Sequence, residues 1–168
     1  MAARGRFIPK NPQKYIGNPN DIWFRSSWEV VAMKRFDLNP AVLKWGSEEI
    51  AIPYLKPVID EMGKPSLRPA KYFPDFIVIY RHKDGNIVKS VMEVKPLKES
   101  VDSKANNPYD KLTLAVNKAK WAAAAAFCER NGLKFEVITE RSLFYRAEKP
   151  AKAAKKPTGT RKPRGTRK

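Results

Sequence analysis

The chain has 168 residues, a formal charge of +17 and an apolar content of 42%. That length supports one domain with a buried core, and the apolar content together with four Trp residues excludes a chain that is disordered throughout. The positive balance indicates a polyanionic partner, either nucleic acid or an anionic surface, but does not by itself separate an enzyme from a structural RNA-binding protein.

The cysteine content and the hydropathy limit the cellular compartment and the kinds of site that we expect. Cys128 is the only cysteine, which excludes an internal disulfide and a Cys-rich zinc site and suits a reducing compartment. The first residues lack the apolar centre of a signal peptide, and no stretch approaches the length of a membrane-spanning helix. We therefore expect no membrane partner.

The basic residues gather at the two ends. Residues 1–14 contain four cations and no acid, and residues 149–168 combine Lys and Arg with Pro, Ala, Gly and Thr. Such segments cannot bury a core, so we predict a basic N-terminal arm over 1–14 and a flexible tail over 149–168. The folded domain is then expected over residues 15–148.

The first predicted elements are a helix over residues 25–37 and a strand over residues 48–54. Apolar residues recur at helical spacing in the first segment, Ser26 or Ser27 can cap it, and Pro40 ends it. The second segment alternates between apolar and polar residues, as half-buried strands do.

A Pro-rich loop is expected over residues 56–73, followed by two paired strands. Residues 75–80 are almost entirely apolar, which is typical of a central strand. The sequence Asp84-Gly85-Asn86 predicts a turn, and residues 87–95 then form the partner strand.

A long helix over residues 109–130 and a last strand over residues 135–139 complete the domain. Gly132 stands where a helix commonly ends in a left-handed residue. The resulting order is α-β-β-β-α-β, an α/β fold with a mixed central sheet flanked by helices.

Asp75, Glu93 and Lys95 form the candidate site. Glu93 and Lys95 lie two residues apart and so share one face of a strand, and the apolar residues before them make two adjacent charges costly without a purpose. Carboxylates are the ligands that hard cations such as Mg²⁺ prefer, and a nearby lysine can orient water or stabilise charge on a phosphate. The pattern therefore favours metal-dependent phosphodiester hydrolysis.

The turn at Asp84-Gly85 decides whether this site can form. A two-residue turn would place Asp75 opposite Val94, on the wrong face of the sheet. An odd-numbered loop, such as Lys83-Asp84-Gly85, or a bulge would place Asp75 opposite Glu93. The hypothesis therefore predicts an odd loop or a bulge.

Simpler interpretations stay open for these residues. Glu93 and Lys95 also fit a solvated strand face, and Asp75 also fits a loop cap after Pro74. Glu29 could pair with Arg25 on a helix surface.

Two motifs together resemble a known group of nucleases. Residues 72–76 (Tyr-Phe-Pro-Asp-Phe) followed by residues 92–96 (Met-Glu-Val-Lys-Pro) are similar to the PD-(D/E)XK nuclease superfamily. The likeness extends to the branch that contains the Tn7-type transposon end nuclease through residues 25–29, residues 118–126, Gly132 and residues 135–140. They also resemble the head-completion nuclease-like proteins of T-even-type tailed phages. The resemblance covers about residues 15–140.

This resemblance implies a restriction-endonuclease-like αβββαβ core, disordered basic tails and DNA cleavage dependent on Mg²⁺ or Mn²⁺. Asp75 and Glu93 match the catalytic, metal-binding acids, and Lys95 matches the catalytic lysine. Glu29 matches the first-helix acid that completes the metal site in many members, and the Val94 carbonyl would face the metal. For the phage proteins it implies a part in finishing packaged heads, with portal, neck or capsid proteins as partners. The implied locations are the host cytoplasm during assembly and the virion head or neck.

Basic residues supply the expected DNA contacts, which are independent of sequence and sensitive to salt. The candidates on the long helix and in the tail are Lys118, Lys120, Lys155, Lys156, Arg161, Lys162, Arg164, Arg167 and Lys168. Three hypotheses compete: a metal-dependent DNA endonuclease, a catalytically silent structural head or neck protein, and an RNA-binding module. The last leaves two acids facing a phosphate backbone without a cation to neutralise them.

Overall fold

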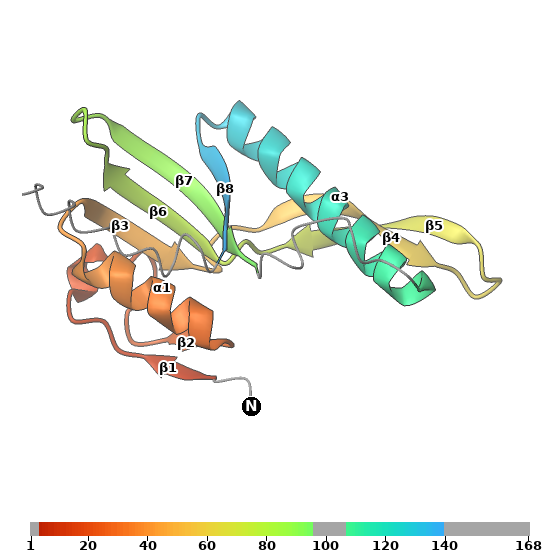
Figure 1. The fold of residues 1–168 in the computed structure, drawn as a ribbon, viewed down its shortest axis with the longest axis horizontal. Coiled ribbons are helices and arrows are strands. Elements are labelled where there is room, and N and C mark those ends of the chain that lie inside the picture. The colour runs from red at the N-terminus through yellow and green to blue at the C-terminus, as the bar shows by residue number, and fades with distance from the viewer. Residues whose placement is uncertain (1–3, 96–106, 140–168) are drawn as a thin grey trace, which may run out of the picture.

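A computed structural model of the chain describes residues 4–95 and 107–139 (Figure 1). Within those residues a central sheet has the strand order β3-β6-β7-β8. Its members are β3 (Val42–Ser47), β6 (Phe76–Arg81), β7 (Ile87–Val94) and β8 (Lys134–Ile138). Neighbouring strands among β3, β6 and β7 pair antiparallel, whereas β8 runs parallel to β7, so the sheet is mixed as predicted.

The helices α1 (Ser27–Leu38) and α3 (Pro108–Arg130) cover opposite faces of this sheet. Met92 of β7 and Ile138 of β8 pack with the buried cluster beneath α1. Phe135, which points to the opposite face of β8 from Ile138, packs with the cluster beneath α3. The chain order of these elements confirms the predicted αβββαβ core.

Both predicted helices are confirmed, and their ends follow local chemistry. The Ser26 hydroxyl caps α1 by accepting the Glu29 backbone N–H at 3.1 Å, and the Asn107 side chain caps α3. Gly132 follows α3 with a φ of +64°, the left-handed conformation expected of it. None of the helices in residues 4–95 and 107–139 is long and apolar enough to cross a bilayer.

The strand predicted over residues 48–54 is confirmed only for residues 52–54, and these do not belong to the central sheet. The central-sheet strand at this place is β3, which ends at Ser47, and Glu48 follows with a left-handed φ of 56°. The next strand, β4 (Ile52–Ile59), belongs to a separate sheet. β3 escaped prediction because its pairing with β6 shifts register between Val42 and Lys44, and such an irregularity breaks the alternation that identifies a strand.

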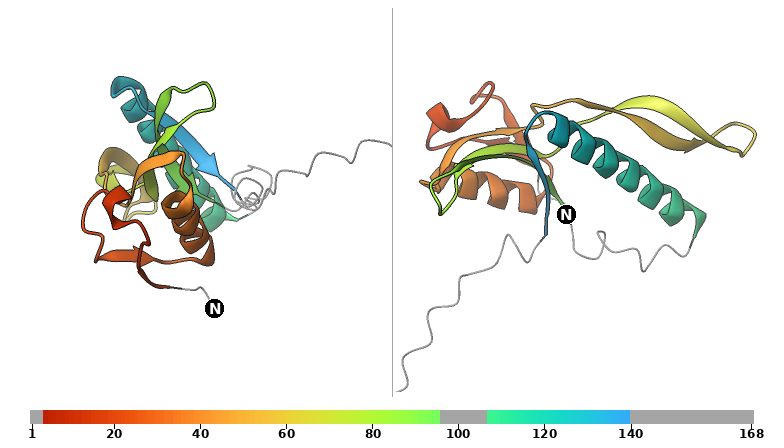
Figure 2. Two further views of the ribbon diagram at one scale, coloured as in Figure 1. Left: turned by 90° about the vertical axis from the view of Figure 1, so that its left-hand side faces the viewer. Right: turned by 90° about the horizontal axis from the view of Figure 1, so that it is seen from above.

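The loop predicted over residues 56–73 is also wrong, because β4 pairs antiparallel with β5 (Pro65–Tyr72) in a two-stranded ribbon. Three prolines in this segment suggested a loop, yet these three and Pro53 before them all occupy the same alternate set of cross-strand pairs. Those pairs are Pro53 with Lys71, Leu55 with Pro69, Pro57 with Leu67 and Ile59 with Pro65. Proline has no N–H to donate, so the ladder bonds must be made at the intervening pairs. The ribbon runs beside α3 and away from the central sheet (Figures 1 and 2).

The basic arm predicted over residues 1–14 is wrong for residues 4–14, which belong to the folded body. β1 (Gly5–Phe7) pairs antiparallel with β2 (Ile22–Phe24), and a 3-10 turn, η1 (Pro12–Lys14), follows β1. Phe7 is buried with its ring centroid 5.7 Å from that of Trp45. The buried Asp37 carboxylate accepts the backbone N–H groups of Lys10 and Asn11 at 2.8 and 3.0 Å. Three predicted segments lie outside the described residues: the start of the arm at 1–3, the end of the domain at 140–148 and the tail over 149–168.

Candidate active site and metal centre

The β6–β7 hairpin places Asp75 beside Glu93. The pairing runs without a shift from Phe76 opposite Met92 to Arg81 opposite Ile87. The His82 N–H then donates to the Asn86 carbonyl at 2.8 Å, which leaves the three-residue loop 83–85 between them. The loop is odd-numbered, as the site hypothesis required. Continuing the register by one residue beyond Phe76 and Met92 sets Asp75 opposite Glu93.

A hydrogen bond confirms this juxtaposition. The Val94 backbone N–H donates to Asp75 Oδ2 at 2.7 Å. This bond orients the Asp75 side chain toward the end of β7, where Glu93 and Lys95 lie.

Glu93 and Lys95 share the sheet face that is turned away from α1. Lys95 Nζ lies 3.4 Å from Glu93 Oε1, and Glu93 is buried with only 5% of its surface exposed. Lys95 follows the end of β7, where its backbone N–H donates to the Ile138 carbonyl at 2.9 Å. Met92 and Val94 point to the other face and pack with the cluster beneath α1. The predicted separation of charged and apolar faces at this strand end is confirmed.

At Asp75, the effects of burial and of neighbouring negative charge outweigh the nearby positive charge. Burial and the adjacent Glu93 charge raise the pKa of Asp75 to about 7, and Glu29 adds a smaller effect in the same direction. The Val94 N–H and the Lys95 ammonium oppose this rise in pKa. Two carboxylates are therefore held close together in a poorly hydrated place. A divalent cation that takes oxygen ligands would relieve their repulsion, so this donor set fits a hard metal ion.

Tyr72 is a site residue that sequence reasoning did not assign. It lies at the end of β5 with 3% exposure, and its hydroxyl donates to Glu93 Oε2 at 2.7 Å. Burial and the neighbouring Glu93 charge raise the pKa of Tyr72, so the hydroxyl stays protonated and remains a donor. The residue was visible in the motif before Asp75, but its segment was expected to be a loop. The signal that could have found it is the alternation of Ile52 and Tyr54 on one face of β4, where Ile52 pairs with Tyr72 and Tyr54 with Ala70.

Glu29 occupies the first turn of α1, where its carboxylate takes part in a cap that resembles a capping box. Its Oε2 accepts the Arg25 backbone N–H at 2.8 Å, and its Oε1 accepts the Ser26 hydroxyl at 2.9 Å. Within residues 4–95 and 107–139, no three His, Cys, Asp or Glu side chains gather as a metal-holding group. The structure thus brings Asp75, Glu93 and Lys95 together, whereas Glu29 acts on Asp75 through its charge. Metal contact by Glu29 and by the Val94 carbonyl stays a prediction.

One of the predicted DNA-binding lysines lies next to the acid pair. Lys120 Nζ is 5.4 Å from the centroid of the Tyr72 ring, in the position of a cation–π contact. Lys118 is exposed on α3. The remaining candidates lie outside the described residues: Lys155, Lys156, Arg161, Lys162, Arg164, Arg167 and Lys168.

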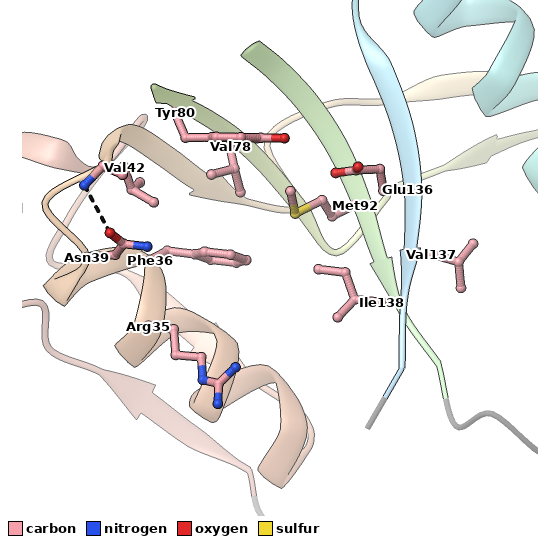
Figure 3. A pocket seen from close by; sticks show the side chains of 11 residues that line it. Arg35, Phe36, Asn39, Val42, Val78, Tyr80, Met92, Glu136, Val137 and Ile138 are labelled. Carbon is pink, nitrogen blue, oxygen red and sulfur yellow. Dashed lines mark hydrogen bonds between the residues drawn. The ribbon is translucent and has the colours of Figure 1, made fainter. Parts of the chain in front are cut away.

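A pocket of about 400 Å³ lies on the other face of the sheet, between the C-terminal end of α1 and strands β6 to β8 (Figure 3). Apolar groups such as Phe36, Val78 and Ile138 dominate its lining. Its acid, Glu136, is bonded to the Ser90 hydroxyl at 2.8 Å and to Lys134 at 2.6 Å. The pocket contains neither Asp75 nor Glu93, so it is separate from the candidate site.

The mixed sheet between two helices, with an acid pair and a lysine where two paired strands end, defines a nuclease-like protein of the PD-(D/E)XK type. A family model described as the TnsA-like endonuclease N terminal matches residues 39–140, more than half of the chain, and the chain belongs to this family. Over 153 residues the chain is also 34% identical to the protein named "Head completion nuclease" from Enterobacteria phage T4. That alignment covers 85% of this chain and 95% of the relative.

Proposed function

We propose that the protein is a DNA endonuclease dependent on Mg²⁺ or Mn²⁺, with Asp75 and Glu93 as metal ligands and Lys95 as the catalytic lysine. The observation that carries this proposal is the pairing of Asp75 with Glu93 across the β6–β7 hairpin, with Lys95 Nζ 3.4 Å from Glu93 Oε1. Membership of an endonuclease family supports the reaction class.

Each residue at the site has a definite task in this proposal. A bound divalent cation supplies polarisation of the scissile phosphate and a lower pKa for the attacking water. Asp75 is oriented for this purpose by the Val94 N–H, and Glu93 is oriented by the Tyr72 hydroxyl. Lys95 presents a cation beside Glu93, where it can stabilise charge that develops on the phosphate. We further propose that the Val94 carbonyl and Glu29 complete the metal surroundings.

DNA is the proposed substrate because the charge of the chain suits a polyanion. The net charge is +17, and Lys120 lies against the Tyr72 ring next to the acid pair. Lys118 and the basic residues beyond residue 149 are proposed to contact phosphates without reading sequence. Two adjacent carboxylates at the site repel a phosphate unless a cation lies between them.

Cleavage of supercoiled plasmid with Mg²⁺, Mn²⁺ or EDTA tests the proposal. The wild type should cut with either metal and not with EDTA. Asp75→Asn and Glu93→Gln should each lower the rate by about 100-fold or more, since each replaces a ligand anion. Glu136→Gln is the matched control, because it removes a carboxylate on the neighbouring strand but on the opposite sheet face. A wild type as inert as Glu93→Gln across metals and DNA forms would refute the nuclease assignment.

We also propose that this activity serves completion of phage heads, on the strength of the 34% identity to a protein named for that role. The proposed partners are packaged DNA and portal, neck or capsid proteins. The proposed locations are the host cytoplasm during assembly and then the virion head or neck.

A catalytically silent structural head or neck protein is the second candidate. It is favoured by the engagement of both Glu29 oxygens in the cap of α1, which leaves only two of the three proposed acids facing each other. Complementation of a phage that lacks the protein separates the two candidates. Asp75→Ala and Lys95→Ala should give few infectious particles if cleavage matters, whereas full infectivity would favour the structural role.

A further inference from the structure

A second pocket, of about 840 Å³, opens between the β1–β2 pair and the end of β3. Its lining includes Trp23 and Phe24 of β2 and the next residue, Arg25. It also includes Arg4, which precedes β1, and Ser47 and Glu48 where β3 ends.

The pocket adjoins the candidate active site. Ser47 pairs with Phe76, the residue after Asp75, across the β3–β6 ladder. The Glu48 backbone N–H donates to the Asp75 carbonyl at 3.2 Å. A chain bound at the acid pair therefore has this pocket as an immediate neighbour.

An exposed indole forms one wall of the pocket. Trp23 keeps 55% of its surface exposed, while Ile22 beside it is buried. The Trp23 Nε1 donates to Asp21 Oδ1 at 2.8 Å, a bond made by the edge of the ring. The Phe24 ring lies against Gly5, where an added Cβ would come within 3.0 Å of the ring. The lining of the pocket thus includes an exposed tryptophan and a second aromatic residue whose ring is packed against Gly5.

Arginine side chains surround this aromatic wall. Arg4 and Arg25 line the pocket, and Arg6 is the cross-strand partner of Trp23. The Arg25 guanidinium makes two hydrogen bonds to the Glu48 carboxylate, at 2.7 and 2.9 Å, and its side chain keeps 72% exposure. This ion pair holds Arg25 at the pocket mouth while leaving much of the guanidinium surface open.

We infer that the pocket binds one unpaired nucleotide of the DNA, with its base stacked on Trp23 and its phosphate near Arg4 and Arg25. Every base has a π face that can stack on an aromatic ring, but inside a duplex both faces are covered by neighbouring bases. Away from duplex ends, only an unpaired nucleotide offers a free face. The inference rests on the proposed function, because it names the substrate of the same site as DNA with a single-stranded segment beside the cleaved bond.

Binding without metal tests the inference independently of cleavage. The affinity of a labelled short oligothymidylate and of a blunt duplex is measured in EDTA for wild type, Trp23→Ala and Trp23→Phe. Trp23→Ala should weaken oligothymidylate binding about tenfold and duplex binding far less, and Trp23→Phe should restore most of the loss because it keeps a stacking ring. Tyr109→Ala, which removes an exposed aromatic ring at the start of α3, is the control and should change neither affinity. Thermal melting of each variant confirms that it is folded.

Two results would overturn the inference. One is a Trp23→Ala variant that binds the oligothymidylate as tightly as the wild type does. The other is an equal loss for oligothymidylate and duplex, which would make Trp23 a general support of the surface. If Trp23-dependent binding is found but no DNA is cleaved with metal, the proposed nuclease function fails and the nucleotide pocket stands. If DNA is cleaved with metal, but neither the form of the DNA nor Trp23→Ala changes binding or cleavage, the nucleotide-binding role of the pocket is refuted. The proposed nuclease function is then retained.

Discussion

The hydroxyl of Tyr72 donates a 2.7 Å hydrogen bond to Oε2 of Glu93, although the two residues are 21 positions apart in the sequence. The bond joins the end of the proline-containing ribbon to the acid pair of the central sheet. It also satisfies one oxygen of a carboxylate that is almost fully buried. The ribbon therefore contributes directly to the geometry of the proposed metal centre.

Replacing Tyr72 by Phe removes this donor while keeping the ring. We expect a loss of about 1–2 kcal/mol in the free energy of unfolding, since a buried carboxylate oxygen is left without its partner. Metal-dependent cleavage should fall by about tenfold, because residues that orient a metal ligand affect metal binding on that scale. Chemical denaturation and plasmid cleavage measure the two effects. Tyr54→Phe is the control, because the Tyr54 hydroxyl makes no hydrogen bond within residues 4–95 and 107–139. Equal effects of the two substitutions would contradict a specific role for Tyr72.

The raised pKa of Asp75 predicts the pH dependence of stability in metal-free protein. The folded state binds the Asp75 proton with a pKa of about 7, against 3.8 for the ordinary side chain. Between these two pH values the folded state holds more protons than the unfolded state, so this group's contribution to stability falls as pH rises through the window. Melting in EDTA from pH 4 to pH 8 should show the wild type losing Tm relative to Asp75→Asn. Parallel pH profiles for the two proteins would contradict the prediction.

Metal binding should reverse this dependence. A divalent cation at Asp75 and Glu93 favours the ionised carboxylates, so binding near pH 6 should release a proton from Asp75. Calorimetric titration with Mn²⁺ in two buffers of different ionisation enthalpy measures that proton directly. Asp75→Asn should abolish the release, and a release that Asp75→Asn leaves unchanged would assign the proton elsewhere.

The helix-capping role of Glu29 and the effect of its charge can be tested separately. Glu29→Gln keeps a side-chain acceptor at the helix cap and should change the free energy of unfolding by less than about 0.5 kcal/mol, whereas Glu29→Ala should cost about 1 kcal/mol. If Glu29 also serves the metal, Glu29→Gln should slow cleavage at full stability, though less than Glu93→Gln does. An unchanged rate for Glu29→Gln would restrict Glu29 to the cap.

Asp37 holds the N-terminal segment on the body, and its loss should release that segment. Its carboxylate accepts the Lys10 and Asn11 N–H groups, and its carbonyl accepts the Asn11 side chain at 2.9 Å. We expect Asp37→Ala to cost about 2–4 kcal/mol and to expose Arg4, Arg6 and Lys10 to trypsin, because buried donors lose a charged acceptor. Asp60→Ala, which removes an exposed turn acceptor at the ribbon tip, is the control and should cost less than about 1 kcal/mol. Unaltered tryptic cleavage of Asp37→Ala would show that other contacts hold the segment.

Prediction from sequence succeeded where the determining interactions are local. The cap of α1 at Ser26, the end of α3 at Gly132 and the strands on either side of Asp84-Gly85 each depend on neighbouring residues. It failed where a distant partner decides the conformation. Residues 4–14 have the composition of a basic arm, but Asp37 and Trp45 bind them to the body. Residues 56–73 have the prolines of a loop, but each proline occurs at a pair that needs no ladder hydrogen bond from it.

The sequence by itself determined which residues could form the site, because the strand period of two places Glu93 and Lys95 on one face. It also required an odd loop between the paired strands, and the loop 83–85 meets that requirement. Only the tertiary structure decided what surrounds the acids: the Tyr72 hydroxyl on Glu93, Lys120 over the Tyr72 ring, and Glu29 held in a helix cap. The physical reason is that side-chain period and loop parity act over a few residues, whereas these contacts depend on how a ribbon, a helix and a sheet pack together.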